Sequence, residues 1–175
     1  MSDFIKPVFT LRSLLCEQLR DLYDAETRYA ALLPEMAAKA TASELKEELH
    51  AIYGRTRDNV SHLQSLCEVL GVEPSGQECE AMKGLVREAK DQASVWGDSA
   101  TQDASLIASA QRIVHYEIAG FGTAKEFGRC LKLDEVSDVL SDLLERAFAH
   151  DKALTRIATG SWLSPGINQE SVHAA

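Results

Sequence analysis

Apolar residues recur at spacings of three and four along four long stretches of the chain, which is the pattern of helices that each bury one face. The four stretches cover residues 10–39, 43–70, 103–131 and 134–160. Thr10 is the expected N-cap of the first, residues 41–44 have the form of a capping box for the second, and Gly71 is expected to end it. No segment alternates β-branched or aromatic residues with polar ones, so we predict an all-α fold with little or no sheet.

The lengths of the connections predict how these helices are arranged. Short links join the first helix to the second and the third to the fourth, whereas residues 71–102 separate the second from the third. A short amphipathic helix is expected near Met82 inside this long connection. Two antiparallel hairpins joined by a long crossover form a ferritin-like four-helix bundle. We expect one domain over residues 10–163, with flexible termini at 1–9 and 164–175, which lack a periodic apolar face.

Composition and charge exclude several classes of function. The 175 residues are 45% hydrophobic and carry a formal net charge of -9, so the surface repels phosphate backbones and anionic lipid. We therefore expect neither nucleic acid nor a membrane as partner. The first ten residues lack the charged start and apolar run of a leader, and we expect a cytoplasmic protein. The four cysteines form no CxxC pair and are expected to be buried, small apolar residues.

Three polar residues interrupt the apolar stripes near the middle of their helices: Glu26, Glu117 and His150. A charged group in the core is costly unless it is paired or binds a metal, and mid-helix positions of an antiparallel bundle lie at similar heights. The three side chains could therefore converge on a carboxylate metal site. The alternative is that both glutamates flank the stripe and reach water or arginines, while His150 is a satisfied core histidine.

Three runs of sequence resemble a known family. Residues 19–26 (LRDLYDAE), 79–85 (CEAMKGL) and 104–119 (ASLIASAQRIVHYEIA) look like the hallmark stretches of the YciE/YciF ferritin-like stress proteins of bacteria. The resemblance spans residues 11–160. It implies a ferritin-like bundle, a homodimer and a suspected dimetal centre with no established reaction. Val114, Ile118 and Val139 are apolar residues outside the main stripes and are the expected interface material.

The chain also departs from the family pattern at expected ligand positions. Residues 52–57 replace a run rich in His and Glu, Val114 replaces a Glu, and residues 146–147 replace consecutive Glu. Of the ligands that the resemblance implies, this chain retains Glu26, His115 and Glu117, and His150 is a possible local substitute for a missing ligand. Arg55 is expected to pair with the inward carboxylates in place of metal ions.

These departures lead to a functional hypothesis with two alternatives. We expect a stress-associated bundle protein with a degraded dimetal site, a structural or binding role and no cofactor. The first alternative is a metal-dependent oxidoreductase or ferroxidase that binds iron or manganese at a reduced site. The second is an interaction module that docks a partner through one face of the bundle. The sequence leaves the reaction, substrate and protein partner open.

Overall fold

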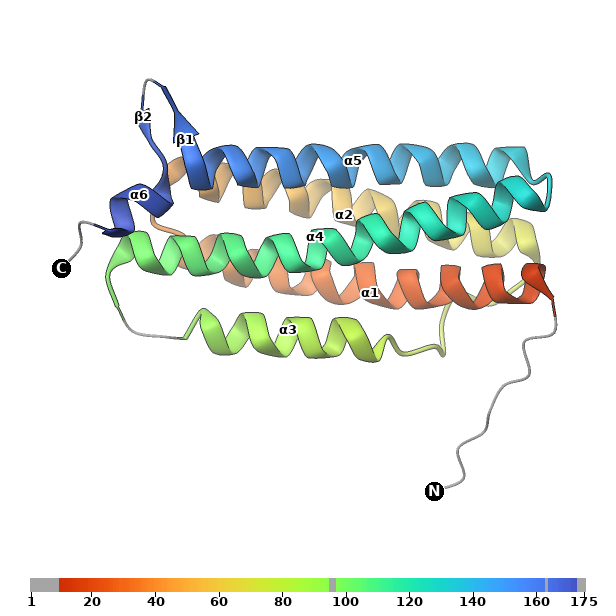
Figure 1. Ribbon diagram of the computed structural model, residues 1–175. Coiled ribbons are helices and arrows are strands. Elements are labelled where there is room, and N and C mark those ends of the chain that lie inside the picture. The colour runs from red at the N-terminus through yellow and green to blue at the C-terminus, as the bar shows by residue number, and fades with distance from the viewer. Residues whose placement is uncertain (1–9, 95–96, 163, 173–175) are drawn as a thin grey trace.

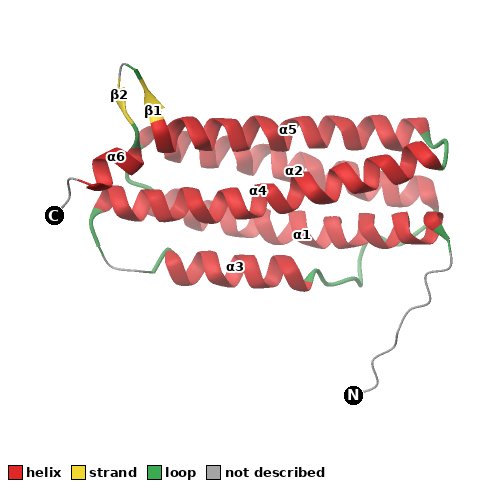
Figure 2. Ribbon diagram, viewed as in Figure 1, coloured by secondary structure: helices red, strands yellow, loops and turns green. Residues whose placement is uncertain are grey.

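The computed structural model describes residues 10–94, 97–162 and 164–172, and within these residues the chain is almost entirely helical. The elements are α1 (Leu11–Lys39), α2 (Ser43–Leu70), α3 (Glu80–Gln92), α4 (Ser99–Cys130), α5 (Asp134–Thr159), β1 (Gly160–Ser161), β2 (Ser164–Pro165) and α6 (Ile167–Val172). The two short strands form one antiparallel hairpin. The all-α prediction is therefore confirmed, and the colouring of Figure 2 shows how little of the described chain is strand.

Four long helices lie side by side, and α3 runs along one side of them (Figure 1). The most extensive contacts join α1 to α2 and α4 to α5, and in each pair the two helices run in opposite directions. The long connection between α2 and α4 returns along the molecule through α3, which packs against α1 and α4. The apolar stripes predicted from the sequence meet in the interior, where apolar side chains of all four long helices are buried.

The helix starts show where local sequence signals succeed and where they fail. Thr10 caps α1 as predicted, because its hydroxyl accepts the Ser13 amide at 3.0 Å. The predicted capping box of α2 is wrong: the N-cap is Ala42, and no side chain of its own turn caps the helix. Asp103, expected to open the third helix, lies inside α4, which begins at Ser99.

The carboxylate of Asp103 instead caps α2 from a different helix. It accepts the backbone amides of Thr41 at 2.9 Å and Ala42 at 2.7 Å, and the Thr41 hydroxyl at 2.6 Å. Asp103 is buried, so these bonds satisfy amides that have no partner within the helix. The turn between α1 and α2 is thereby held against the first part of α4.

The C-terminal segment differs from expectation. Residues 164–175 were expected to be flexible, but the structure describes β2 and α6 within them, and α6 packs against α4 and α5. Ile167 anchors this segment, because its side chain is buried. A single buried anchor lacks a periodic pattern, so the sequence gives no signal for it. Residues 1–9 and 173–175, also expected to be flexible, lie outside the described residues. Within the described part of the chain, no helix is long and apolar enough to cross a membrane.

Candidate functional site

Two carboxyl groups meet in the middle of the core, Glu26 from α1 and Glu117 from α4. Their side chains are 0% and 2% exposed, and the two carboxyl groups are in hydrogen-bond contact. Burial raises the pKa of Glu26 to about 7. Burial, together with the nearby charge of Glu26, raises the pKa of Glu117 well above its ordinary value. Glu117 is therefore the member of the pair that stays protonated to higher pH, and its protonated carboxyl group donates a hydrogen bond to Glu26.

The other two long helices, α2 and α5, each add one polar side chain next to this carboxyl pair. The Asn59 side chain of α2 donates from Nδ2 to Glu26 Oε2 at 3.0 Å. On the other side of the same amide, Nη1 of Arg146 from α5 donates to Asn59 Oδ1 at 3.3 Å. This orientation of the amide is the favourable one, because its carbonyl faces the cation and its NH2 faces the carboxylate. The amide thus lies between a guanidinium and a carboxylate.

His150 lies in a neighbouring contact. Its Nδ1 is 2.9 Å from Oε1 of Glu48 on α2, and the imidazole is buried. Tyr29 is buried as well. Burial, and then the charges of the nearby glutamates including Glu48, raise its pKa well above the ordinary value. Within the described residues, the Tyr29 hydroxyl and His150 Nε2 have no hydrogen-bond partner, and neither does Oε1 of either core glutamate.

The structure brings some of the predicted site residues together and separates others. It joins Glu26 to Glu117 as expected, while His150 contacts Glu48. His115, 63% exposed, contacts Asp151 at 3.2 Å on the surface. The expected pair between Arg55 and the core carboxylates is wrong, because Arg55 is exposed and the group that contacts Glu26 is the Asn59 amide.

Sequence reasoning missed Asn59 and Arg146 for different reasons. Periodicity by residue type places the apolar Val60 on the buried face of α2, but the structure buries Asn59 and leaves Val60 half-buried. The buried positions 52, 56, 59 and 63 follow steps of four, three and four, so strict helical spacing would have found Asn59. Arg146 is half-buried beside the core position Ala147, and only the tertiary contact reveals its partner.

The donor set fits a dimetal centre poorly. Such a centre in a ferritin-like bundle takes a Glu from each of two helices and a Glu-x-x-His pair from each of the other two. Here α2 offers an amide N–H to Glu26, and the group of α5 that contacts this amide is the Arg146 guanidinium. Among the described residues, no three His, Cys, Asp or Glu side chains are grouped so that they could hold a metal ion. The residues present therefore do not match the group that the family resemblance implies.

A second polar cluster joins α3 to the long helices, and it is built from the three hallmark stretches. The Cys79 amide donates to Asp24 Oδ2 at 2.7 Å, and Cys79 Sγ lies 3.0 Å from the Tyr116 hydroxyl. That hydroxyl donates to Asp21. Cys79 is also the N-cap of α3, since its sulfur accepts the Met82 amide at 3.4 Å. These stretches therefore fix the position of α3.

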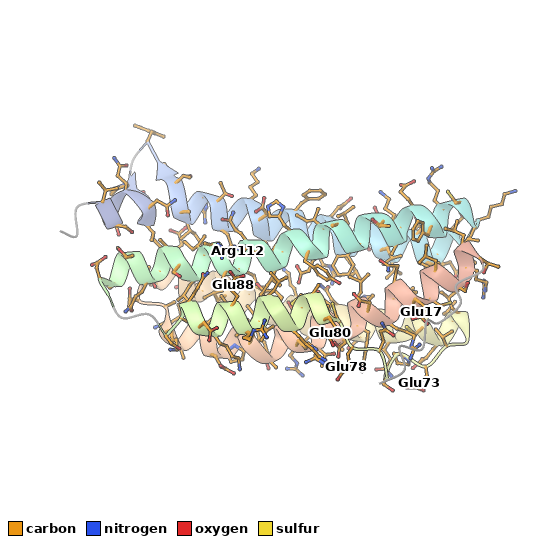
Figure 3. The ribbon with its side chains drawn as sticks, turned by 60° about the horizontal axis from the view of Figure 1, so that its bottom comes forward. Glu17, Glu73, Glu78, Glu80, Glu88 and Arg112 are labelled. Atoms are coloured by element: carbon orange, nitrogen blue, oxygen red, sulfur yellow. The ribbon has the colours of Figure 1, made fainter. Side chains whose placement is uncertain are left out.

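The outer edge of this region is acidic. Figure 3 shows Glu80 and Glu88 on α3, Glu78 and Glu73 on the connection before it, and Glu17 on α1. Lys83 partly compensates this charge by pairing with Glu78 and, at 2.8 Å, with Glu80.

The four cysteines are all free thiols, but only Cys67 and Cys79 are buried as expected, while Cys130 is exposed.

The fold and the site define an all-α protein with four long helices and a carboxyl pair at its centre. The chain belongs to the family described as a domain of unknown function, DUF892, whose sequence profile matches residues 10–170. It is 29% identical to the protein YciF of Escherichia coli over 150 residues, which are 85% of this chain and 90% of YciF. The resemblance to the YciE/YciF proteins is thereby confirmed.

Solved structures show the same fold. The crystal structure of the E. coli stress protein YciF matches with a TM-score of 0.81 and 28% identity, over 85% of this chain and 94% of that one. YcfI from Rhodopseudomonas palustris, for which a structural role has been suggested, matches with a TM-score of 0.84 and 33% identity. That match covers 89% of this chain and 99% of YcfI. A protein from Xanthomonas campestris matches in fold alone, with a TM-score of 0.68 and 17% identity, over 93% and 92% of the two chains.

Proposed function

We propose that this YciF-type stress protein is a ferritin-like four-helix bundle whose dimetal site has been lost and whose role is structural or binding. The observation that carries the proposal is the contact of Asn59 with Glu26, backed by Arg146. Next to Glu26, α2 contributes the Asn59 amide and α5 contributes the Arg146 guanidinium that contacts this amide. A dimetal bundle has carboxylates and imidazoles from these two helices instead.

The charges in the core support this function. Because the pKa values of Glu26 and Glu117 are both raised, the pair carries less than its full two negative charges at neutral pH, and Arg146 supplies one positive charge nearby. Two divalent ions would add about four positive charges, which a full set of carboxylate ligands offsets but this core does not. Metal binding here would have to displace the carboxyl proton and would add positive charge to a site that already has a guanidinium nearby.

The second candidate function is a metal-dependent oxidoreductase or ferroxidase with a reduced site. It is favoured by the unpartnered Oε1 atoms of Glu26 and Glu117 and by Nε2 of His150, which are ligand types for iron and manganese. In this reading a metal ion would draw His150 away from Glu48.

Elemental analysis separates the two functions. The protein is purified without an affinity chelator, and iron, manganese and zinc are measured per chain before and after incubation with Fe²⁺ or Mn²⁺. We expect far less than one ion per chain and no iron oxidation above that of Glu26→Gln/Glu117→Gln. Two ions per chain that are lost together on Glu26→Ala would establish the oxidoreductase instead.

The proposal includes the setting of the protein. We propose a cytoplasmic homodimer without a nucleic-acid or membrane partner. The net charge of -9 supports the exclusion of polyanions, and the family resemblance supports the dimer.

A further inference from the structure

One polar side chain from each of the four long helices takes part in a single continuous chain of contacts. It runs from Arg146 on α5 to Asn59 on α2, from Asn59 to Glu26 on α1, and from Glu26 to Glu117 on α4. Glu26, Asn59 and Glu117 are buried, whereas Arg146, at one end of this chain of contacts, is half-buried. We call these four residues the polar cross-link.

We propose that the polar cross-link fixes the register of the four helices, in the way that a metal centre would link them. The inference rests on the proposed function, in which the core holds no dimetal site. Each contact joins a different pair of helices, so sliding one helix by a turn would break at least one contact and leave a buried polar group without a partner. Apolar side chains in the same stripes can exchange neighbours at much lower cost.

The direction of each hydrogen bond supports a specific role for the four residue types. Asn59 is a donor toward the carboxylate and an acceptor toward the guanidinium, and a carboxylate or a leucine at position 59 could not be both. Buried polar networks commonly add little to stability compared with apolar packing, and their best-attested use is to select one register. The polar cross-link should therefore show strong energetic coupling and a loss of structural uniqueness when it is removed.

A double-mutant cycle tests the coupling. Arg146→Met leaves Asn59 Oδ1 without its partner, and Asn59→Leu removes the Asn59 contact from both Arg146 and Glu26. We expect each single variant to lower Tm by about 5 °C and the double variant to lower it by clearly less than the sum. Arg55→Met is the matched control: it removes an exposed arginine from α2, should leave Tm nearly unchanged, and should combine additively with Asn59→Leu.

Amide NMR spectra test the register itself. We expect Asn59→Leu/Arg146→Met to keep its helical circular dichroism while its amide resonances broaden or double and the dye ANS binds. The wild type and Arg55→Met should give one sharp set of resonances. Additive effects in the cycle would overturn the inference. A double variant that still gives one sharp set of resonances would overturn it as well.

Repeating the melts with EDTA and with Mn²⁺ distinguishes this inference from the proposed function. We expect the Tm of the wild type to be the same in both. A wild-type Tm that falls with EDTA would defeat the proposed function, and with it the inference. An unchanged Tm together with additive variants would defeat the inference alone.

Discussion

The pKa of Glu117 is raised well above its ordinary value because two effects act in the same direction. The side chain is removed from water, and the Glu26 carboxylate beside it would repel a second negative charge. Asn59 can lower the cost of one charge on Glu26 but has no second N–H directed at Glu117 in the described contacts. The core therefore disfavours the state in which both carboxyl groups are ionised.

This pair makes stability depend on pH. The folded pKa of Glu26 is about 7 against 4.5 for a solvated Glu, so the folded state holds a proton that the unfolded chain releases. The free energy of unfolding therefore falls as pH rises from about 4.5 through about 7, and the raised pKa of Glu117 extends the loss to higher pH. We expect a lower Tm at pH 8.5 than at pH 5.5.

The contribution of the pair is isolated with Glu117→Gln, which keeps a neutral hydrogen-bond donor but cannot ionise. We expect the decline of Tm between these two pH values to be shallower in this variant. Glu47→Gln, at an exposed position of α2, is the control and should follow the wild type. Equal slopes for the wild type and Glu117→Gln would show that Glu117 does not contribute to the pH dependence in this range.

At the scale of the elements, the start of α2 depends on a residue sixty positions away in the sequence. We expect Asp103→Ala to lower the free energy of unfolding by about 3 kcal/mol, because two backbone amides and one hydroxyl lose a buried charged acceptor. Asp98→Ala removes an exposed N-cap of the same chemistry from α4 and should cost about 1 kcal/mol. Urea denaturation of both variants measures the difference. Equal losses would mean that Asp103 acts only as a local cap.

The helix α3 depends on its N-terminal attachment to α1. Asp24 accepts the Cys79 amide and pairs with Arg28 at 2.6 Å. We expect Asp24→Ala to speed amide hydrogen exchange in residues 80–92 by about thirtyfold, from a local loss of about 2 kcal/mol. Glu35→Ala removes the exposed pair with Lys90 at the other end of α3 and should change exchange little. A similar effect of both variants would refute the N-terminal attachment as the main one.

The elements also show what the sequence could predict. Helical periodicity predicted the long helices and placed Glu26 and Glu117 inward. Buried positions recur at every turn of a helix, and this spacing does not depend on which element packs against it. It could not find the cap that Asp103 gives to α2, because that contact joins segments which are distant in the sequence. The choice of Arg55 failed for a related reason. A cation had to lie near the carboxyl pair, but periodicity on α2 alone could not show that α5 supplies it through Asn59.

At the scale of the whole molecule, we expect a second copy to bind at the surface between α4 and α5. Val114, expected at an interface, is fully buried in the core, which removes it from any surface. Ile118 is half-buried, and Phe148 is 53% exposed. His115 meets Asp151, and Gly122 lies opposite Leu144. In this antiparallel register Ile118 and Phe148 lie at a similar height on the two helices, so we expect these two apolar side chains to form one surface.

The homodimer remains a prediction, and this surface gives it a specific test. Light scattering at micromolar concentration should give twice the chain mass of 19.2 kDa for the wild type. Phe148→Glu should give the single-chain mass, because a charge would be buried without a partner at the interface. Val69→Glu changes an equally apolar side chain on α2, 65% exposed, and should remain dimeric. A wild type of 19.2 kDa would refute the dimer, whereas a dimer that persists in Phe148→Glu but dissociates in Val69→Glu would move the interface to α2.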